Sequence, residues 1–331
     1  MLRIRLTSAT IAALSWVVLL HTPAVAQTSS ATTWPNRPVT MVVTYAAGGT
    51  TDIVGRIVAE HVSRRLGQQM IVENRPGAGG NTGTELVKRA APDGYTLSLC
   101  TIGTCAINSS IYANTGYDVQ KDFVPVVVVG GVVNVLAVNP KVPAKSVKEL
   151  VQLAKARPDS LTYGSSGYGT SPHLSGELLK DMAGVEITHV PYKGSAPVIV
   201  DLRGGQIDLF FDNAPSILPH VKPGPLRALA TTGAKRSKLL PDVPTMEEAG
   251  FPGFVIEPWW GVLAPAKAPP AVVARLNRAI NEVLNDPVVI RRFDEIGLDI
   301  WGGPPERMAN LIRTETAKWG KLVRDRGIKA E

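Results

Sequence analysis

The spacing of hydrophobic residues changes repeatedly along the chain, and each change predicts a new element. Short apolar runs rich in Val and Ile predict strands at residues 39–44, 70–73 and 95–100. Between these runs, apolar side chains three and four residues apart predict helices at 51–66, which Gly67 ends, and at 84–91. Strands that alternate with helices in this way are typical of an α/β fold with mostly parallel sheets.

A Val-rich stretch at residues 124–138, broken by Gly130 and Gly131, precedes a second block of the same character. Two Ser/Thr-x-x-Glu capping boxes, a pattern typical of helix starts, begin at Ser146 and Thr245. The second block predicts strands at 161–163, 187–190, 207–211 and 228–231, and helices that begin near residues 146 and 172. Residues 255–263 predict a last strand, residues 270–284 an amphipathic helix, and two more helices follow.

Neither a repeat nor a low-complexity linker separates the two blocks. We therefore expect two domains that interrupt each other, with the chain crossing between them at residues 124–138 and 250–257. On this basis we assign residues 27–128 and 252–331 to one lobe and residues 129–251 to the other.

The first 26 residues predict an export signal. Arg3 and Arg5 precede an apolar run at residues 11–20, and Pro23 comes just before Ala-Val-Ala, a small-x-small cleavage site, at 24–26. The apolar run is about half of the roughly 20 residues needed to span a bilayer, so a retained anchor helix is the weaker alternative. We expect cleavage to leave a periplasmic chain that starts near Gln27.

Charge and cysteine content narrow the possible functions. The chain has 35 Lys and Arg against 28 Asp and Glu, and its basic residues are scattered rather than gathered with aromatics, so a nucleic-acid partner is not expected. Cys100 and Cys105 are the only cysteines; they either form a small disulfide loop or are two unpaired small residues at a strand end. Without a nearby His cluster they do not predict a zinc site, and no other metal is expected.

Two Gly-rich loops follow the first two predicted strands. In residues 45–52, Tyr-Ala-Ala-Gly-Gly-Thr-Thr-Asp, glycines let the backbone approach a ligand, and the N–H groups of the following helix would favour an anion; the alternative is that the polar residues only cap that helix. In residues 74–83, Gly77 and Gly79 would need a third glycine at position 82, which is Thr82. The second loop therefore does not predict nucleotide binding, and no cofactor is expected.

A third loop, residues 163–173, supplies several hydroxyl groups before a helix. It departs from the Gly-x-Ser-x-Gly elbow of serine hydrolases, although His173 with Ser165 or Ser166 could make a catalytic pair on residue types alone. Helix capping by Thr170 or Ser171 is the other interpretation.

Asp212 follows the apolar strand at 207–211, and ligands of α/β sheets bind at the carboxyl ends of strands, so it is a candidate for the cleft. We expect His189, which lies inside its strand, to pack against its neighbours rather than to contact a ligand. Trp259 and Trp260 are expected mainly to pack in the core, although one of them could form the floor of a pocket.

These loops resemble those of the Bug receptors, the TctC-type substrate-binding components of tripartite tricarboxylate transporters. The resemblance extends from Trp34 to the C-terminal helices. It is carried by residues 45–52, 74–81, 91–95, 163–167, His173, 190–194 and 240–245. The resemblance implies a two-lobed periplasmic binding protein of type II (Venus flytrap), each lobe a mostly parallel sheet flanked by helices, with two chain crossings.

The resemblance also implies a function: binding of a small carboxylate in the interdomain cleft, often through backbone N–H groups and waters, and delivery to integral-membrane transporter subunits. We expect a monomer and no enzymatic activity; a ligand-presenting sensor and a periplasmic serine hydrolase are the alternatives. The family's ligand loops match Tyr45, Ala47, Gly48, Gly49 and Asp52 in the first loop and Ser165, Ser166, Thr170 and His173 in the third. The family's first loop often has Pro where this chain has Ala46, a difference that could loosen the turn, and no Arg clamp is evident.

Overall fold

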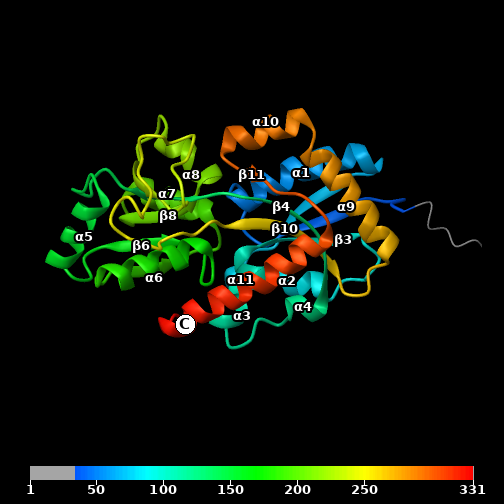
Figure 1. Ribbon diagram of the computed structural model, residues 1–331, viewed down its shortest axis with the longest axis horizontal. Helices are drawn as coiled ribbons and strands as arrows, with labels where there is room; N and C mark the ends of the chain where they lie inside the picture. Colours follow the sequence, from blue (N-terminus) through cyan, green and yellow to red (C-terminus); the bar gives the residue numbers. More distant parts are fainter. Residues whose placement is uncertain (1–33, 331) are drawn as a thin grey trace, which may run out of the picture. The chain divides into compact units, whose positions relative to one another are not determined.

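The computed structural model describes residues 34–330, so the predicted export signal lies outside the described residues. The described chain forms two β-sheets, each flanked by helices, which confirms the predicted two-lobed α/β fold (Figure 1). Of the helices in this part of the chain, none is both long and apolar enough to cross a membrane.

Lobe 1 is built on the six-stranded sheet β11-β4-β10-β3-β1-β2 and combines the two ends of the described chain. Its strands are β1 (Val39–Val43), β2 (Met70–Asn74), β3 (Thr96–Thr101), β4 (Phe123–Gly131), β10 (Trp259–Pro265) and β11 (Asp299–Ile300). Its helices are α1 (Thr50–Leu66), α2 (Asn81–Lys88), α3 (Asn108–Ile111), α4 (Val119–Asp122), α9 (Pro270–Leu284), α10 (Pro287–Ile296) and α11 (Pro305–Asp325), with short helical turns η1 (Ala78–Gly80) and η2 (Gly103–Ile107).

Lobe 2 is built on the five-stranded sheet β7-β6-β8-β5-β9 from the middle of the chain. Its strands are β5 (Asn134–Val138), β6 (Thr162–Ser165), β7 (Thr188–Pro191), β8 (Leu209–Asn213) and β9 (Arg227–Thr231). Its helices are α5 (Val147–Ala156), α6 (Ser171–Ala183), α7 (Ser195–Gly204) and α8 (Ala214–Val221).

Most strands of each sheet run in one direction, and the exceptions include the strand by which the chain enters from the other lobe. In lobe 1, β1 is parallel to β2 and β3, whereas β10, which arrives from lobe 2, is antiparallel to both β3 and β4. The short β11 is antiparallel to β4. In lobe 2, β6 is parallel to β7 and β8, whereas β5, which arrives from lobe 1, is antiparallel to β8 and β9.

The chain passes between the sheets at two places. Residues 132–133 separate β4 from β5, and residues 232–258 lead from β9 back to β10. The Val-rich stretch predicted as a crossing is therefore two strands in different sheets, and the predicted lobe boundary after residue 128 falls inside β4. Gly130 and Gly131 lie at the end of β4, but the pattern does not show that the two Val-rich halves join different sheets, because both strands are largely buried on both faces.

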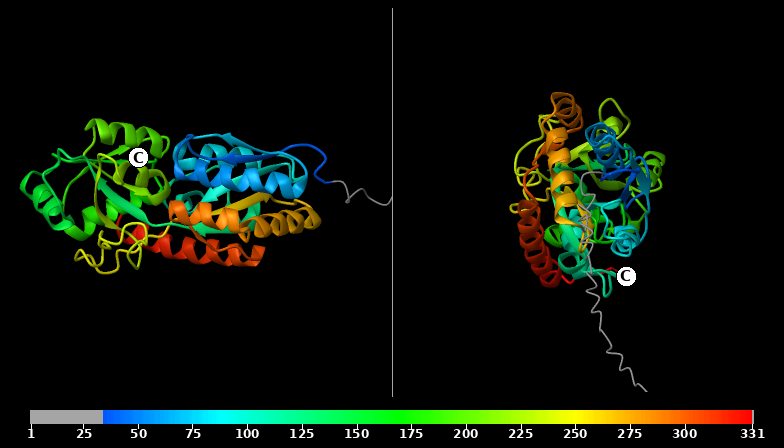
Figure 2. Two further views of the ribbon diagram at one scale, coloured as in Figure 1. Left: turned by 90° about the horizontal axis from the view of Figure 1, so that it is seen from above. Right: turned by 90° about the vertical axis from the view of Figure 1, so that its right-hand side faces the viewer.

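Side chains of the central strands alternate between two cores. In β5, Leu136 and Val138 pack into a cluster with α6 and α11 residues, while Val135 and Ala137 pack against α7 and α8. This two-sided burial explains why the strands read as uninterrupted apolar runs. The C-terminal helix α11 lies along lobe 1 (Figure 2). Just beyond its end, Arg326 pairs with Asp181 of α6 in lobe 2.

The second capping box forms its hydrogen bonds without a helix. Thr245 N–H donates to the Glu248 carboxylate at 2.9 Å, and Glu248 N–H donates to Thr245 Oγ1 at 3.1 Å, but the segment is a series of turns. Gly250, at a φ of +102°, and Pro252 follow at once and prevent a helix from continuing.

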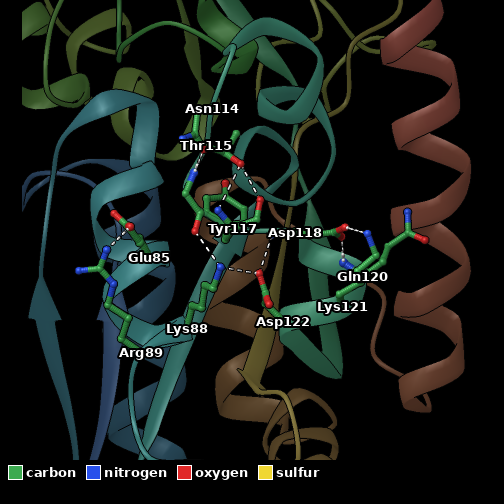
Figure 3. A network of polar contacts seen from close by, with 11 residues as sticks. Glu85, Lys88, Arg89, Asn114, Thr115, Tyr117, Asp118, Gln120, Lys121 and Asp122 are labelled. Carbon is green, nitrogen blue, oxygen red and sulfur yellow. Dashed lines mark hydrogen bonds and ion pairs between the residues drawn. The ribbon is translucent and has the colours of Figure 1, made fainter.

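Polar contacts attach the segment before β4 to α2 (Figure 3). Lys88 Nζ lies 3.0 Å from the Asp122 carboxylate and donates to the Gly116 carbonyl at 3.0 Å. Tyr117 donates to Asn81 Oδ1 at 2.9 Å. These bonds fix the approach to β4, the strand that leads to the first crossing.

Candidate functional site

A small cavity lies between the two lobes, at the carboxyl ends of strands from both sheets. Its volume is about 30 Å³, which leaves room for ordered water. It is lined by Tyr45, Gly49, Thr50, Thr51, Thr101, Ile102, Ser166, Thr170, Ser171, Pro172, Ser195, Asn213, Pro258 and Trp260. This is the position in which α/β sheets bind ligands.

Three helices begin at this cavity without a side-chain cap. Gly49 precedes α1, Gly194 precedes α7 and Asn213 precedes α8, and in none of the three does a side chain accept from the first N–H groups. In α1 and α7 those N–H groups have no partner within the helix, whereas in α8 the Ala214 N–H donates to the Val133 carbonyl at 3.0 Å and Pro215 has no N–H. Each of the three helices adds a partial positive charge at its start. The convergence of α1 from lobe 1 with α7 and α8 from lobe 2 therefore favours an anionic group.

The cavity offers hydroxyl groups rather than cationic side chains. Within residues 34–330, none of the lining residues is Lys, Arg or His. Trp260 forms one wall, and its indole N–H donates to Thr51 Oγ1 at 3.0 Å. Any charge on a ligand would thus be met by N–H groups, hydroxyl groups and ordered water.

Some residues of the first loop line the cavity, and others only hold the loop in place. Tyr45 and Gly49 line the cavity, whereas Ala47 and Gly48 are exposed and do not. The Tyr45 hydroxyl donates to the Gly79 carbonyl at 2.9 Å, which holds the first two Gly-rich loops together.

Asp52 supports the first loop from within. Its carboxylate accepts from Gly48 N–H at 3.0 Å, from Arg56 Nε at 2.9 Å and from Asn74 Nδ2 at 3.0 Å. Burial acts to raise the pKa of Asp52, but the bonds from Arg56, Gly48 and Asn74 outweigh it and lower the pKa. The carboxylate therefore stays ionised, and its oxygens are engaged by the protein.

The second Gly-rich loop touches lobe 2 directly. Gly79, at a φ of +60°, lies so close to Tyr168 that a Cβ atom there would be 2.1 Å from the Tyr168 carbonyl oxygen. Tyr112 donates to the same oxygen at 3.1 Å. The glycines that rule out a nucleotide loop by their spacing serve here to let two loops from different lobes meet.

The third loop is held by two histidines behind it. Ser166 and Thr170 line the cavity, but Ser165 is completely buried; its Oγ lies 2.6 Å from His189 Nε2 and accepts from Gly167 N–H at 3.1 Å. His173 Nδ1 accepts from the N–H of the glycine at position 169 at 3.3 Å.

Burial lowers the pKa of His173 to about 4 and, together with His173 beside it, that of His189 to about 3. Both rings are therefore neutral at pH 7. The serine–histidine contact involves His189 instead of His173, and because Ser165 has no exposed surface its hydroxyl is not offered to a bound molecule. His189, expected only to pack, orients the loop.

Asp212, the strand-end candidate, lies behind the lining instead of within it. It is completely buried, and its two oxygens accept from Ser195 at 2.7 Å and from Ser216 at 2.5 Å. Burial raises the pKa of Asp212 to about 7, although the bonds from Ser216, Ser195 and the Asn213 backbone oppose the shift.

Several lining residues were not among the predicted site residues. Thr101 ends β3, Asn213 ends β8 and Ser195 begins α7, so the signal that could have identified them is their place at a strand end or helix start. Next to Thr101, Cys100 and Cys105 form a disulfide with their Cα atoms 6.0 Å apart, which fastens the end of β3 to η2.

A larger depression of about 1040 Å³ lies on lobe 1 beside α9. Its rim carries both signs of charge, with Arg65 and Arg278 beside Glu282 and Glu306, and all of its lining residues belong to one lobe. The depression shows no preference for an anion and no coupling to lobe 2, so the interlobe cavity is the better candidate.

Known proteins similar to this chain cover most of its length. The family model described as tripartite tricarboxylate transporter family receptor matches residues 54–328. Protein BugT of Bordetella pertussis is 39% identical over 313 residues, 94% of this chain and 96% of BugT. R. palustris Rpa4515, solved with adipate, is 41% identical with a TM-score of 0.87, covering 89% of this chain and 99% of that one. MatC (Rpa3494) from Rhodopseudomonas palustris, solved with malate, is 32% identical with a TM-score of 0.85, covering 88% and 100%.

Proposed function

Because the chain belongs to the tripartite tricarboxylate transporter receptor family, we propose that it captures a small carboxylate in the interlobe cavity and delivers it to membrane subunits of such a transporter. The observation that carries the proposal is the convergence of three uncapped helix starts on one cavity. Helix N-termini bind carboxylates without a cationic side chain.

The chemistry of the ligand follows from the lining and from the relatives. Two similar proteins were solved with adipate and with malate, both dicarboxylates. Here helix starts face the cavity from both lobes, so a dicarboxylate can place negative charge against each. We propose Tyr45, Gly49, Ser166 and Thr170 as direct contacts, with Ala47, Gly48, Asp52, Ser165, His173 and Asp212 acting through the loops that hold them.

Capture requires the lobes to separate. Hydrogen bonds cross between the lobes beside the cavity, from Ala46 N–H to the Lys193 carbonyl at 3.1 Å and from Thr50 Oγ1 to Ser216 Oγ at 2.9 Å. Opening at residues 132–133 and 232–258 would break these bonds, and closure around the ligand would restore them.

The place of action is the periplasm in this proposal. The basic, apolar and small-residue order of residues 1–26 supports export, and membrane subunits would receive the ligand at the periplasmic face. Uptake of labelled dicarboxylate into vesicles carrying those subunits should depend on added receptor.

The direct test is a thermal-shift screen of residues 27–331 with adipate, malate and matched neutral diamides. A ligand at about 100 times its Kd should stabilise the protein by about 2.7 kcal/mol. Dicarboxylates should raise the Tm and the diamides should not. If only the neutral compounds raise it, the proposed ligand class is wrong.

A further inference from the structure

A chain of hydrogen bonds links Asp212 to two hydroxyl groups that line the cavity. Ser195 and Ser216 donate to its two oxygens, at 2.7 Å and 2.5 Å. Ser216 is bonded to Thr50 at 2.9 Å, and Ser195 lies 3.0 Å from Ser166. Thr50 at the start of α1 and Ser166 after β6 are thus joined to one buried carboxylate from opposite sides of the cavity.

The directions of these bonds are fixed while Asp212 is ionised. A carboxylate only accepts, and a hydroxyl group has one proton to donate. Ser195 and Ser216 therefore donate their hydrogen bonds to Asp212. Ser166 donates to Ser195, and Thr50 donates to Ser216. The two cavity hydroxyls are left with lone pairs towards a ligand, so they accept hydrogen bonds and donate none.

One proton on Asp212 reverses one branch of the chain. The new carboxyl O–H donates to Ser195, the proton of Ser195 turns to Ser166, and the proton of Ser166 turns to the cavity. No covalent bond changes other than the O–H formed at Asp212 with a proton from solvent. Ser166 then donates to a ligand, and a buried negative charge near the cavity is removed.

We propose that Asp212 determines whether the Ser166 hydroxyl at the cavity donates to the ligand or accepts from it, so that binding of a carboxylate draws one proton onto Asp212. The ionised form favours instead a ligand group that donates, such as a hydroxyl, an amide or an ammonium. Asp212 acts through Ser195 and Ser166 and is a specificity-determining residue without touching the ligand. The inference rests on the proposed function.

The surroundings of Asp212 make it the group that titrates near neutrality. Burial raises its pKa to about 7, so both forms are present at pH 7. The neighbouring strand β5 has no charged residue, and Tyr163 of β6 is bonded to Glu177 of α6. The charged or titratable groups on the other packed elements, besides Glu177, are Asp52, Arg56, Glu60, His61, Arg64 and Arg65 on α1, His173, Lys180 and Asp181 on α6, Asp201 and Arg203 on α7, and His220 on α8.

These groups do not share the behaviour of Asp212. Asp52 is held ionised by Arg56, and burial keeps His173 neutral, with a pKa of about 4. Asp201 accepts from Tyr192 at 2.7 Å. Burial and then Arg203 lower the pKa of His220, whereas burial raises that of Asp212.

The test is calorimetric titration of the mature protein with adipate, which carries no donor group when ionised, between pH 6 and pH 8. Repeating each titration in buffers of different ionisation enthalpy gives the protons taken up per ligand. Above a pKa of about 7, affinity should weaken up to about tenfold per pH unit, with uptake near one proton at pH 8 and well below one at pH 6.

Asp212→Asn provides the variant, because its amide has a permanent donor and an acceptor and does not titrate. It should bind adipate with nearly the same Kd at pH 6 and pH 8 and take up no proton. Asp201→Asn, a partly exposed acid on α7, is the matched control and should keep the wild-type pH dependence.

The outcomes separate the two proposals. Adipate binding by the wild type without proton uptake at pH 8 overturns the role of Asp212 and leaves the proposed function standing. Uptake that persists in Asp212→Asn assigns the proton to another group and also overturns it. If no carboxylate binds at any pH, the proposed function itself is wrong, and this inference falls with it. The wild-type measurement decides even if the variant does not fold.

Discussion

Replacing Gly79 with alanine should oppose closure of the lobes much more than it affects the fold of either lobe. The added Cβ would lie 2.1 Å from the Tyr168 carbonyl oxygen and 2.6 Å from the Tyr112 hydroxyl, whereas ordinary contacts begin near 3.4 Å. The backbone oxygen cannot rotate away as a flexible side chain would. The facing loops must therefore move apart by more than 1 Å.

The expected loss combines two effects, and only one of them depends on closure. A left-handed φ costs an L-residue about 1–2 kcal/mol whether the lobes are together or apart. Overpacking against the Tyr168 carbonyl, which belongs to lobe 2, costs about 1–3 kcal/mol more, and only in the closed arrangement. Because 1.4 kcal/mol corresponds to a factor of ten, adipate affinity should fall roughly 5- to 150-fold.

Gly184 provides the matched control. Its φ is +59° against +60° for Gly79, and nothing lies within 4 Å of a Cβ built there. Gly184→Ala should therefore lose similar stability in urea unfolding without ligand but bind adipate as the wild type does in calorimetry. Equal adipate affinities for the two variants would refute the argument that this close approach is needed for capture.

Three further changes test single contacts. Ala46→Pro removes the N–H that donates to the Lys193 carbonyl at 3.1 Å, so ligand affinity should fall by about 0.5–1.5 kcal/mol, while Lys193→Ala, which keeps that carbonyl, should have no effect in the same titration. The pKa of Asp52 is lower in the folded protein than in the unfolded chain, so the ionised carboxylate stabilises the fold above the unfolded pKa, and this stabilisation is lost as the pH falls through the folded pKa. In urea unfolding, Asp52→Asn should be less stable than the wild type at pH 7, and the difference in unfolding free energy should shrink towards pH 3. Reducing the bond between Cys100 and Cys105 should lower the unfolding free energy by about 2 kcal/mol, less than for a long loop, and no change on adding reductant would contradict the pairing.

The elements were predictable where their signals are local. Residues 270–284 carry an apolar stripe and open with Pro at the first turn, and α9 has those limits. The helix predicted at 84–91 begins instead at Asn81, because Gly83 obscures its first turn. The division of the Val run into β4 and β5 is set by which sheet each half joins, and no local pattern encodes that choice.

The candidate site, too, was predictable from sequence only where its signals are local. Tyr45, Gly49, Ser166 and Thr170 belong to loops with a visible composition, and they lie at the cavity. The hydrogen bonds of Asp212 join separate elements, so sequence could place this residue at a strand end but could not identify its partners. Likewise, the histidine that contacts Ser165 could only be found once β6 and β7 were paired.

The absence of a cationic side chain from the lining described here gives closure a direct role in recognition. Each helix start supplies about half a unit charge, and the effect fades within a turn. Lobe 1 contributes α1, whereas α7 and α8 belong to lobe 2, so an open protein presents a carboxylate with only part of the available field. A ligand with one anionic group would engage one side and leave the other hydrated. A ligand that spans the cavity would gain from both sides only when the lobes meet. We therefore expect the proposed closure to favour small dicarboxylates over the monocarboxylates that resemble half of them.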